Sequence, residues 1–235
     1  MAVTFVLLPG AGSDSWYWHR VVPILTGHGH AAITVDLPYS DESAGQYEFA
    51  DVVVKAARDV EGPVVLVAQS MSAFTAAIVC ERTDVDVDVD LLVLVAPMLP
   101  APGESAGEWW ENTGQSAAQR AFAVSEGRDP TATNDLRELF FHDVPEGLIE
   151  EAFQAEEVAM SDTPFETVWR AQEWPHVKTR VIVGSRDRLF PVDFMKRIVR
   201  ERLSIAPDVI DAGHLIALAR PRELAAALEG YVEGL

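Results

Sequence analysis

Residues 64–72 read VVLVAQSMS, and residues 73–80 continue as AFTAAIVC. The first run is aliphatic and of strand length, and it stops abruptly at Ser70. The second run is small and apolar, which is typical of a helix packed closely against a strand. Together they predict a buried strand, a tight turn with Ser70 at its apex, and a helix. The usual form of such a nucleophile elbow is G-x-S-x-G. Ala68 and Ser72 replace the two glycines here, and both are small enough for the strand and helix to approach.

Five further apolar runs have strand length, and helical patterns separate them. They cover residues 3–8, 31–35, 91–96 and 180–183, with a last short run ending at Ile210. Helices are expected at residues 47–60, 192–203 and from Leu215 to the C-terminus. Alternating strands and helices predict an α/β fold with a doubly wound, mainly parallel six-stranded sheet.

The stretch from residue 98 to residue 175 breaks this alternation. It contains helical patterns and nine large aromatic side chains, but no buried strand pattern. Thr163 and Glu166 are spaced as a capping box, with Pro164 at the first helical position. We expect a core made of residues 1–97 and 176–235, with a helical cap of residues 98–175 inserted after the fourth strand. Most of the aromatics are expected to pack inside the cap rather than line a pocket.

Composition argues against several classes of partner. The chain has 235 residues and a formal net charge of −19, which disfavours nucleic acid and anionic membranes because both require a basic surface. No apolar run reaches the ~18 residues needed to span a membrane. The N-terminal run lacks a basic region before it, so it is expected to be a strand rather than a signal peptide. We expect a cytoplasmic protein.

Two features could indicate other kinds of site. Cys80 is the single cysteine, so an intrachain disulfide or a multi-cysteine metal site is excluded, and Cys80 is expected in the core. Residues 84–90 read DVDVDVD, which invites a calcium interpretation. A calcium-binding loop of the EF-hand type needs glycine at its sixth position and glutamate at its twelfth, where this chain has Val89 and Val95. We expect a solvated entry to the fourth strand and no metal.

Four chemically useful residues each follow a predicted strand. They are Ala11, Ser70, Asp187 and His214. In parallel sheets, ligands bind beyond the carboxyl ends of the strands. A serine hydroxyl becomes a nucleophile when a histidine accepts its proton and a carboxylate orients that histidine. We therefore predict Ser70 as nucleophile, His214 as base and Asp187 as the orienting acid. The alternative is a catalytically inactive relative.

Other histidines and aspartates fit these roles less well. The remaining five histidines do not lie at a strand exit that leads into a helix, and Asp36 is expected to hold a turn. An oxyanion formed by attack of Ser70 needs preorganised N–H donors. The expected donors are the backbone amides of Met71 and of Ala11, in the loop of residues 10–12. A simple glycine turn is the alternative interpretation of that loop.

The chain resembles the α/β-hydrolase superfamily over essentially its whole length. The matching segments are FVLLPGAG at residues 5–12 with Trp16 and Trp18, the Ser70 elbow, APMLP at 96–100 with GES at 103–105, GSRD at 184–187 and DAGH at 211–214. The nearest likeness is to plant methylesterases, hydroxynitrile lyases and bacterial esterase-like proteins. This resemblance implies a helical cap over the site.

Departures from these relatives narrow the expected chemistry. The lyases carry a lysine after the catalytic histidine and a threonine in the oxyanion loop, where this chain has Leu215 and Gly10. The usual His-Gly pair of that loop is Pro9 and Gly10 here. Dehalogenases and epoxide hydrolases of this fold use an aspartate nucleophile. Ser70 at the predicted nucleophile position therefore disfavours these two enzyme classes. Leu215 and Gly10 together favour ester hydrolysis over cyanohydrin cleavage.

The sequence therefore predicts a serine hydrolase, a carboxylesterase that cleaves a small or medium apolar ester through an acyl-enzyme on Ser70. No cofactor or metal is expected. Two alternatives remain open. One is a cofactor-free lyase, or another enzyme that uses His214 as a base. The other is a non-catalytic protein whose aromatic cap binds an apolar ligand.

Overall fold

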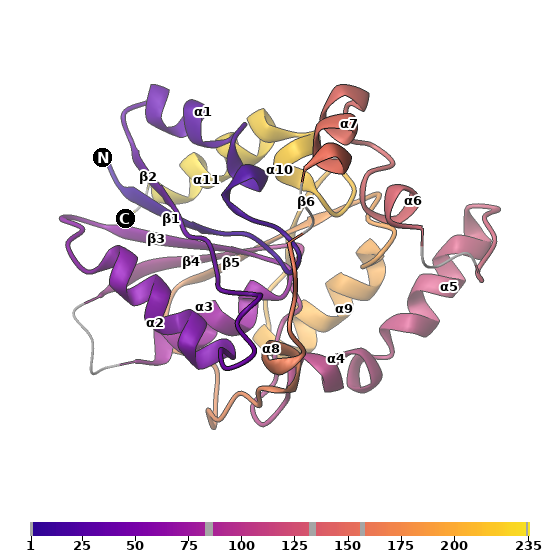
Figure 1. Ribbon diagram of the computed structural model, residues 1–235, viewed down its shortest axis with the longest axis horizontal. Helices are drawn as coiled ribbons and strands as arrows, with labels where there is room; N and C mark the ends of the chain where they lie inside the picture. Colours follow the sequence, from indigo (N-terminus) through magenta and orange to yellow (C-terminus); the bar gives the residue numbers. More distant parts are fainter. Residues whose placement is uncertain (1, 83–86, 132–134, 156–157, 234) are drawn as a thin grey trace.

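A parallel six-stranded sheet forms the centre of the computed structural model, which describes residues 2–82, 87–131, 135–155, 158–233 and 235 (Figure 1). The strand order is β2-β1-β3-β4-β5-β6, and every neighbouring pair is parallel. The strands are β1 Thr4–Leu8, β2 Ala31–Thr34, β3 Val64–Gln69, β4 Val89–Val95, β5 Thr179–Gly184 and β6 Asp208–Ile210. This arrangement confirms the predicted doubly wound sheet.

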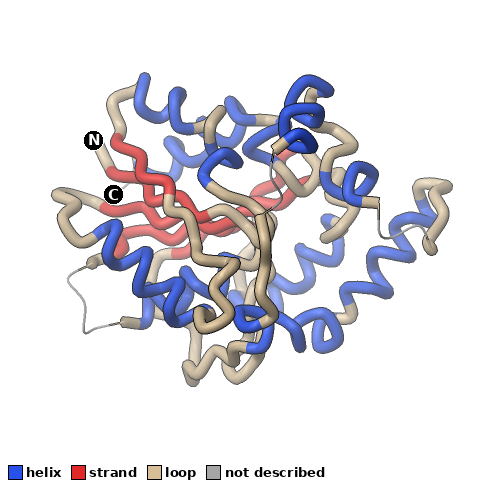
Figure 2. The backbone as a smooth tube through the Cα atoms, viewed as in Figure 1, coloured by secondary structure: helices blue, strands red, loops and turns tan. Residues whose placement is uncertain are grey.

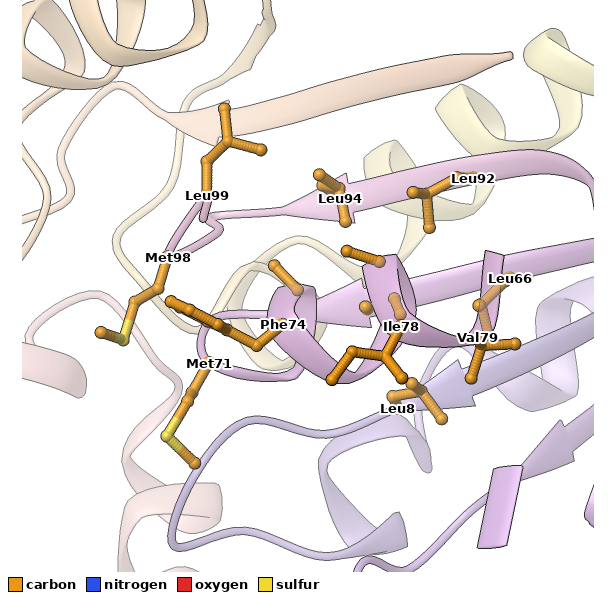
Figure 3. Close-up of a cluster of buried hydrophobic side chains, with 14 of the residues drawn as sticks. Leu8, Leu66, Met71, Phe74, Ile78, Val79, Leu92, Leu94, Met98 and Leu99 are labelled. Atoms are coloured by element: carbon orange, nitrogen blue, oxygen red, sulfur yellow. The ribbon is translucent and has the colours of Figure 1, made fainter. Parts of the chain in front are cut away.

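Helices cover both faces of the sheet, which is why its central strands are continuous apolar runs. One face packs against α2 (Gln46–Ala57), α3 (Ser72–Glu81) and α9 (Val192–Leu203). The other face packs against the 3-10 helix η1 (Ser15–Trp18) with α1 (Val22–Gly27), α10 (Ile216–Ala219) and α11 (Pro221–Val232) (Figures 1 and 2). Figure 3 shows Phe74 and Ile78 of α3 among the leucines of the sheet.

Residues 98–175, which we call the helical segment, run between β4 and β5. Their described part contains helices and adds no strand to the sheet. The helices are α4 Ala106–Thr113, α5 Gln115–Ser125, α6 Leu136–Phe140, α7 Glu146–Gln154 and α8 Thr163–Glu166. In Figure 1, α5, α6 and α7 lie at the right, beyond the end of the sheet where the strands finish.

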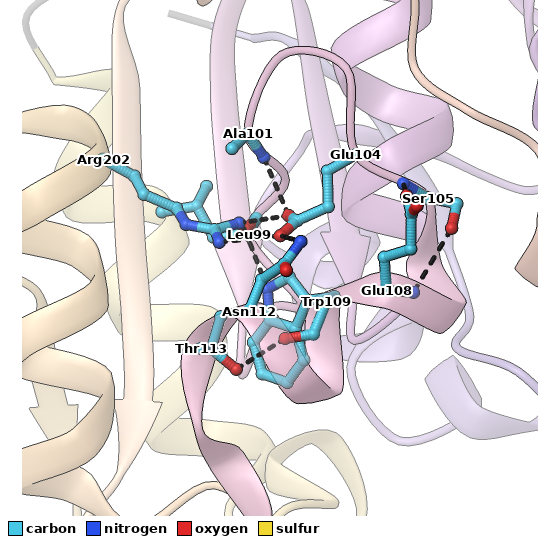
Figure 4. Close-up of polar contacts among 9 residues, drawn as sticks. All are labelled: Leu99, Ala101, Glu104, Ser105, Glu108, Trp109, Asn112, Thr113 and Arg202. Carbon is cyan, nitrogen blue, oxygen red and sulfur yellow. Dashed lines mark hydrogen bonds and ion pairs between the residues drawn. The ribbon is translucent and has the colours of Figure 1, made fainter.

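A buried ion pair anchors the start of the helical segment to the core. The Glu104 carboxylate, 4% exposed, pairs with Arg202 of α9 (Figure 4). The same carboxylate accepts hydrogen bonds from the Ala101 amide at 3.0 Å and from Asn112 Nδ2 at 2.9 Å. A buried charge is tolerated when it is paired and its remaining lone pairs are used, and both conditions hold for Glu104.

The predicted capping box at Thr163 and Glu166 is wrong. Asp162, rather than Thr163, precedes α8, and it makes no side-chain cap. The Thr163 hydroxyl donates instead to the Glu42 carbonyl oxygen at 2.6 Å. Pro164 does lie in the first turn, as predicted. The helical segment forms a capping box elsewhere: the Ser105 hydroxyl accepts from the Glu108 amide, and the Glu108 carboxylate accepts from the Ser105 amide (Figure 4).

The structure also describes Cys80 and the last part of the aspartate-rich stretch of residues 84–90. Within residues 84–90, positions 84–86 lie outside the described residues, whereas Asp90 accepts a hydrogen bond from the Val64 amide at 2.8 Å at the start of the strand pair. No cluster of potential metal ligands occurs among the described residues. Cys80 is partly buried and packs against the core. Of the helices described, none is both long and apolar enough to cross a bilayer.

Candidate active site

Ser70 occupies the sharp turn between β3 and α3. Its φ is 55°, in the left-handed region that residues other than glycine rarely adopt. Two hydrogen bonds hold it there: the Ser70 amide donates to the Val95 carbonyl at 3.1 Å, and its carbonyl accepts from the Met98 amide at 3.0 Å. Such backbone strain persists where the surroundings determine the conformation, as at nucleophile elbows.

The small residues around the elbow have different roles. Ala68 is fully buried within β3. Ser72 does more than fit, because its hydroxyl donates a short hydrogen bond to the Pro9 carbonyl oxygen, and the Tyr39 hydroxyl lies 3.4 Å from Ser72 Oγ. Ser72 thereby joins the elbow to the loop after β1. The prediction for Ser72 rests on its small size alone, and its hydroxyl is the sequence feature that indicates this further contact.

The three predicted side chains meet beyond the ends of β3, β5 and β6. His214 Nε2 lies 3.2 Å from Ser70 Oγ, and His214 Nδ1 lies 2.8 Å from Asp187 Oδ2. Asp187 and His214 are each 1% exposed. An Nδ1–H directed at the carboxylate leaves Nε2 with a lone pair facing the serine hydroxyl. The arrangement can remove a proton from Ser70.

Close contact between two loops makes this meeting possible. The Ser185 amide donates to the Ile210 carbonyl at 2.8 Å, and the Arg186 amide donates to the Ala212 carbonyl at 2.9 Å. A Cβ atom on Gly184 would lie within 2.5 Å of the Gly213 carbonyl oxygen. Only glycine at position 184 therefore lets the Asp187 loop approach the His214 loop this closely.

Aromatic rings surround the histidine. Phe140 of α6 and Phe190 approach His214 edge-on, with ring centroids at 5.4 and 5.0 Å. Trp109 and Trp110 of α4 in turn contact Phe190. The helical segment therefore contributes to an apolar wall beside the site, and polar interactions are strengthened in such a low-dielectric setting.

The two predicted oxyanion donors come from separate parts of the chain. Ala11 follows β1, and Met71 directly follows Ser70. Neither backbone amide donates a hydrogen bond to another residue within the described ranges. A Cβ atom on Gly10 would overlap Gln69 Oε1 and lie 3.0 Å from Ser70 Cβ. The loop after β1 is thus packed directly against the nucleophile.

Similarity to known proteins identifies the family of this chain. The model of the alpha/beta hydrolase family matches residues 5–227. The chain belongs to the alpha/beta hydrolase family. Norfluorocurarine synthase 1 from Strychnos nux-vomica is 22% identical to it over 251 residues, which cover 96% of this chain and 93% of that protein. Methyl jasmonate esterase 1 from Vitis vinifera is 22% identical over 255 residues, which cover 97% of this chain and 96% of that protein.

Solved structures agree with this assignment. This alpha/beta hydrolase superimposes on the crystal structure of polyneuridine aldehyde esterase with a TM-score of 0.79 and 19% sequence identity, over 98% of this chain and 99% of that chain. At this identity the likeness shows the fold. The family resemblance predicted from the motifs is confirmed.

The aspartate and histidine side chains that were not predicted as catalytic acid or base have other neighbours in this alpha/beta hydrolase. Asp36 is expected to hold a turn, but it accepts hydrogen bonds from the Ser15 amide at 2.6 Å and from the Ser15 hydroxyl at 3.4 Å, so it connects the loop after β2 to the start of η1. His28 pairs with Glu229 on α11. His142, in contrast, lies beside Gly213, a proximity that no sequence pattern indicated.

Proposed function

We propose that this alpha/beta hydrolase is a serine carboxylesterase that cleaves small or medium apolar esters. The single observation that carries the proposal is the chain of contacts from Ser70 Oγ to His214 Nε2 at 3.2 Å and from His214 Nδ1 to Asp187 Oδ2 at 2.8 Å. Relatives named as esterases support the same reaction class.

Acylation is the first half of the proposed cycle. His214 accepts the Ser70 proton as Oγ attacks the ester carbonyl carbon. The amides of Ala11 and Met71, free in the described structure, stabilise the resulting oxyanion. Collapse of this intermediate breaks the bond to the alkoxy oxygen, which leaves as the alcohol with the proton from His214. The acyl group remains on Ser70.

Deacylation repeats the same steps with water. The water oxygen attacks the acyl carbon while His214 accepts a proton from the water molecule. The Ser70 oxygen then leaves and takes that proton from His214. Asp187 keeps Nδ1–H in place and stabilises the transient imidazolium in both halves. The products are a carboxylic acid and an alcohol, and Ser70 is regenerated.

The helical segment is proposed to act as a cap, with residues 1–97 and 176–235 as the core. Phe140 faces His214 from α6, and the Trp16 indole donates to the Glu151 carboxylate of α7 at 2.8 Å. An apolar wall beside the base favours an apolar substrate, because burial of apolar surface contributes roughly 25 cal/mol per Å².

Hydrolysis of p-nitrophenyl acetate and butyrate tests the proposal, with Ser70→Ala as the matched control. The expected result is turnover by the unaltered protein, loss of turnover in Ser70→Ala, and covalent labelling of Ser70 by a fluorophosphonate probe. An unaltered protein that neither hydrolyses these esters nor reacts with the probe would overturn the proposal.

One comparison favours a second candidate function. A relative of similar identity is named a synthase, and a lyase or related enzyme could use His214 as a base without acylating Ser70. Rapid quenching during ester turnover separates the two candidates. An acyl group trapped on Ser70 supports the esterase, whereas catalysis that survives Ser70→Ala supports the base-only reaction.

A further inference from the structure

A buried carboxylate of the helical segment contacts the loop that carries His214. Asp143 lies between α6 and α7, and its side chain is 3% exposed. Asp143 Oδ2 accepts a hydrogen bond from the Gly213 amide at 2.8 Å. Gly213 directly precedes His214, so this bond fixes the backbone from which the predicted base projects.

The same carboxylate also faces the loop that carries Asp187. Arg186, which directly precedes Asp187, has a guanidinium nitrogen 3.5 Å from Asp143 Oδ2. That guanidinium also lies 2.8 Å from the exposed Asp211 carboxylate and donates to the Asp211 carbonyl at 3.0 Å. Asp143 therefore lies where the two loops of the proposed triad meet.

Packing around Gly213 leaves the Asp143 carboxylate little freedom. A Cβ atom on Gly213 would lie 2.6 Å from Asp143 Oδ1 and 2.8 Å from His142 Nε2. Both polar atoms are buried, and neither has a hydrogen-bond partner among the described residues. Desolvation and the nearby Arg188 cation lower the pKa of His142, and the Arg186 guanidinium is the cation that lies 3.5 Å from Asp143 Oδ2.

Stability alone does not account for such an arrangement. Burying a carboxylate carries a desolvation cost that one ion pair at 3.5 Å to a partly exposed arginine offsets only in part. What the carboxylate provides is a strong, directional acceptor for one backbone N–H. That N–H belongs to the residue before His214.

We propose that Asp143 is a positioning residue, through which the helical segment holds His214 at reacting distance from Ser70. The inference rests on the proposed esterase function. A displacement of about 1 Å at a reacting group can lower a rate on the order of 100-fold. Loss of the Asp143 acceptor frees the Gly213 backbone, and the 3.2 Å contact between His214 and Ser70 then loses its constraint.

Three variants test the role of Asp143. Asp143→Ala removes the acceptor, Asp143→Asn retains an oxygen that can accept the Gly213 hydrogen bond, and Glu138→Gln is the control. Glu138 also comes from the helical segment and pairs with an arginine flanking Asp187, at 3.3 Å from Arg188, but its side chain is 59% exposed. Measurements are kcat and KM for p-nitrophenyl butyrate, the rate of fluorophosphonate labelling, and Tm.

The expected pattern is specific to positioning. Asp143→Ala lowers kcat and the labelling rate on the order of 100-fold while KM changes less than about threefold. Asp143→Asn recovers most of the loss, and Glu138→Gln stays within about twofold of the unaltered protein. A role confined to stability would lower Tm and leave kcat unchanged below the melting temperature.

Other results would overturn either the positioning role of Asp143 or the proposed esterase function. An active unaltered enzyme whose kcat is unchanged in folded Asp143→Ala overturns the inference, and so does a folded Asp143→Asn that is as slow as Asp143→Ala. If Asp143→Ala does not fold, Asp143→Ser replaces it. The serine side chain is polar but too short to accept the hydrogen bond from the Gly213 amide. An unaltered protein that neither hydrolyses esters nor labels at Ser70 overturns the proposed function instead.

Discussion

Asp187 uses its two carboxylate oxygens for different partners, and only one of them faces His214. Oδ2 lies 2.8 Å from His214 Nδ1. Oδ1 accepts hydrogen bonds from the amides of Leu189 and Phe190, each at 2.9 Å. The backbone of its own loop thus orients the carboxylate before a substrate arrives, and the imidazole receives a fixed acceptor.

Asp187→Asn is expected to lower kcat by about 10³–10⁴-fold, as loss of the orienting carboxylate does in serine hydrolases with a triad. The amide would favour the wrong imidazole tautomer. Steady-state hydrolysis of p-nitrophenyl butyrate measures the effect. Asp211→Asn, at an exposed carboxylate on the neighbouring loop, is the control and should remain within about twofold. A loss below tenfold in Asp187→Asn would contradict the assigned role.

Ser72→Ala is expected to weaken the connection between the elbow and the loop after β1. The Ser72 hydroxyl donates to the Pro9 carbonyl oxygen in a buried site. Its removal should lower the free energy of unfolding by about 1–3 kcal/mol, because the buried Pro9 carbonyl then keeps only the long hydrogen bond from the Tyr39 hydroxyl at 3.5 Å. We also expect kcat to fall several-fold, since the loop carries the Ala11 amide.

Urea unfolding and ester hydrolysis measure the two effects of Ser72→Ala. Ser125→Ala is the matched control, because its hydroxyl also donates to a carbonyl but lies at the exposed end of α5. If both variants behave alike, the Pro9 contact has no special role.

Gly184→Ala is expected to push the loops of Asp187 and His214 apart. Its Cβ atom would meet the backbone carbonyl oxygens of Ala212 and Gly213, which are not flexible side chains and cannot move separately. We expect a loss of more than about 2 kcal/mol in the free energy of unfolding together with a large fall in kcat.

Gly230→Ala is the control for Gly184→Ala. Gly230 lies in α11, and a methyl group added to it would meet no atom of the described residues within 4 Å beyond its own stretch of helix. Alanine there should raise the free energy of unfolding by roughly 0.5–1 kcal/mol. Equal effects of the two substitutions on stability or kcat would contradict the steric argument.

Cys80 makes stability depend on pH above neutrality. Burial raises the pKa of its thiol from an ordinary value of 9.0 to about 12. The unfolded chain therefore releases this proton first, so the stabilising contribution is complete below pH 9 and is lost as pH rises from 9 towards 12. The expected slope is about 1.4 kcal/mol per pH unit within that window.

Urea unfolding at about pH 7.5, 9 and 10 measures this dependence, and Cys80→Ala should remove the slope that the thiol causes. The range stops near pH 10 because burial also raises the pKa values of Tyr17 and Tyr39 above the ordinary 10.0, which adds a similar dependence at higher pH. A slope that is identical in Cys80→Ala would contradict the prediction.

The sheet and the convergence of Ser70, Asp187 and His214 could be predicted because both follow from local patterns. Apolar runs of strand length mark the strands, and parallel order brings their carboxyl ends to one edge. Ser70 directly follows such a run, and Asp187 and His214 lie in the loops that leave β5 and β6. Their meeting therefore needed no knowledge of contacts between distant residues.

Contacts that depend on the path of the helical segment could not be predicted. Thr163 and Ser105 stand in the same local pattern, but the Thr163 hydroxyl bonds the carbonyl of Glu42, so tertiary structure decided which one caps a helix. Asp143 likewise reaches Gly213 from a segment 70 residues away. No periodicity indicates where either side chain finds its partner.

The two ends of the helical segment meet beside the sheet. The Gly103 amide donates to the Trp169 carbonyl at 2.9 Å, the Trp169 amide donates to the Glu104 carbonyl at 3.0 Å, and Ser105 pairs with Val168. Insertions whose ends lie together are well tolerated in a fold. The chain between these paired ends can therefore lengthen, shorten or be exchanged in evolution, or by an engineer, while the six strands and the serine elbow stay as they are, provided that the contact of Asp143 with Gly213 is kept.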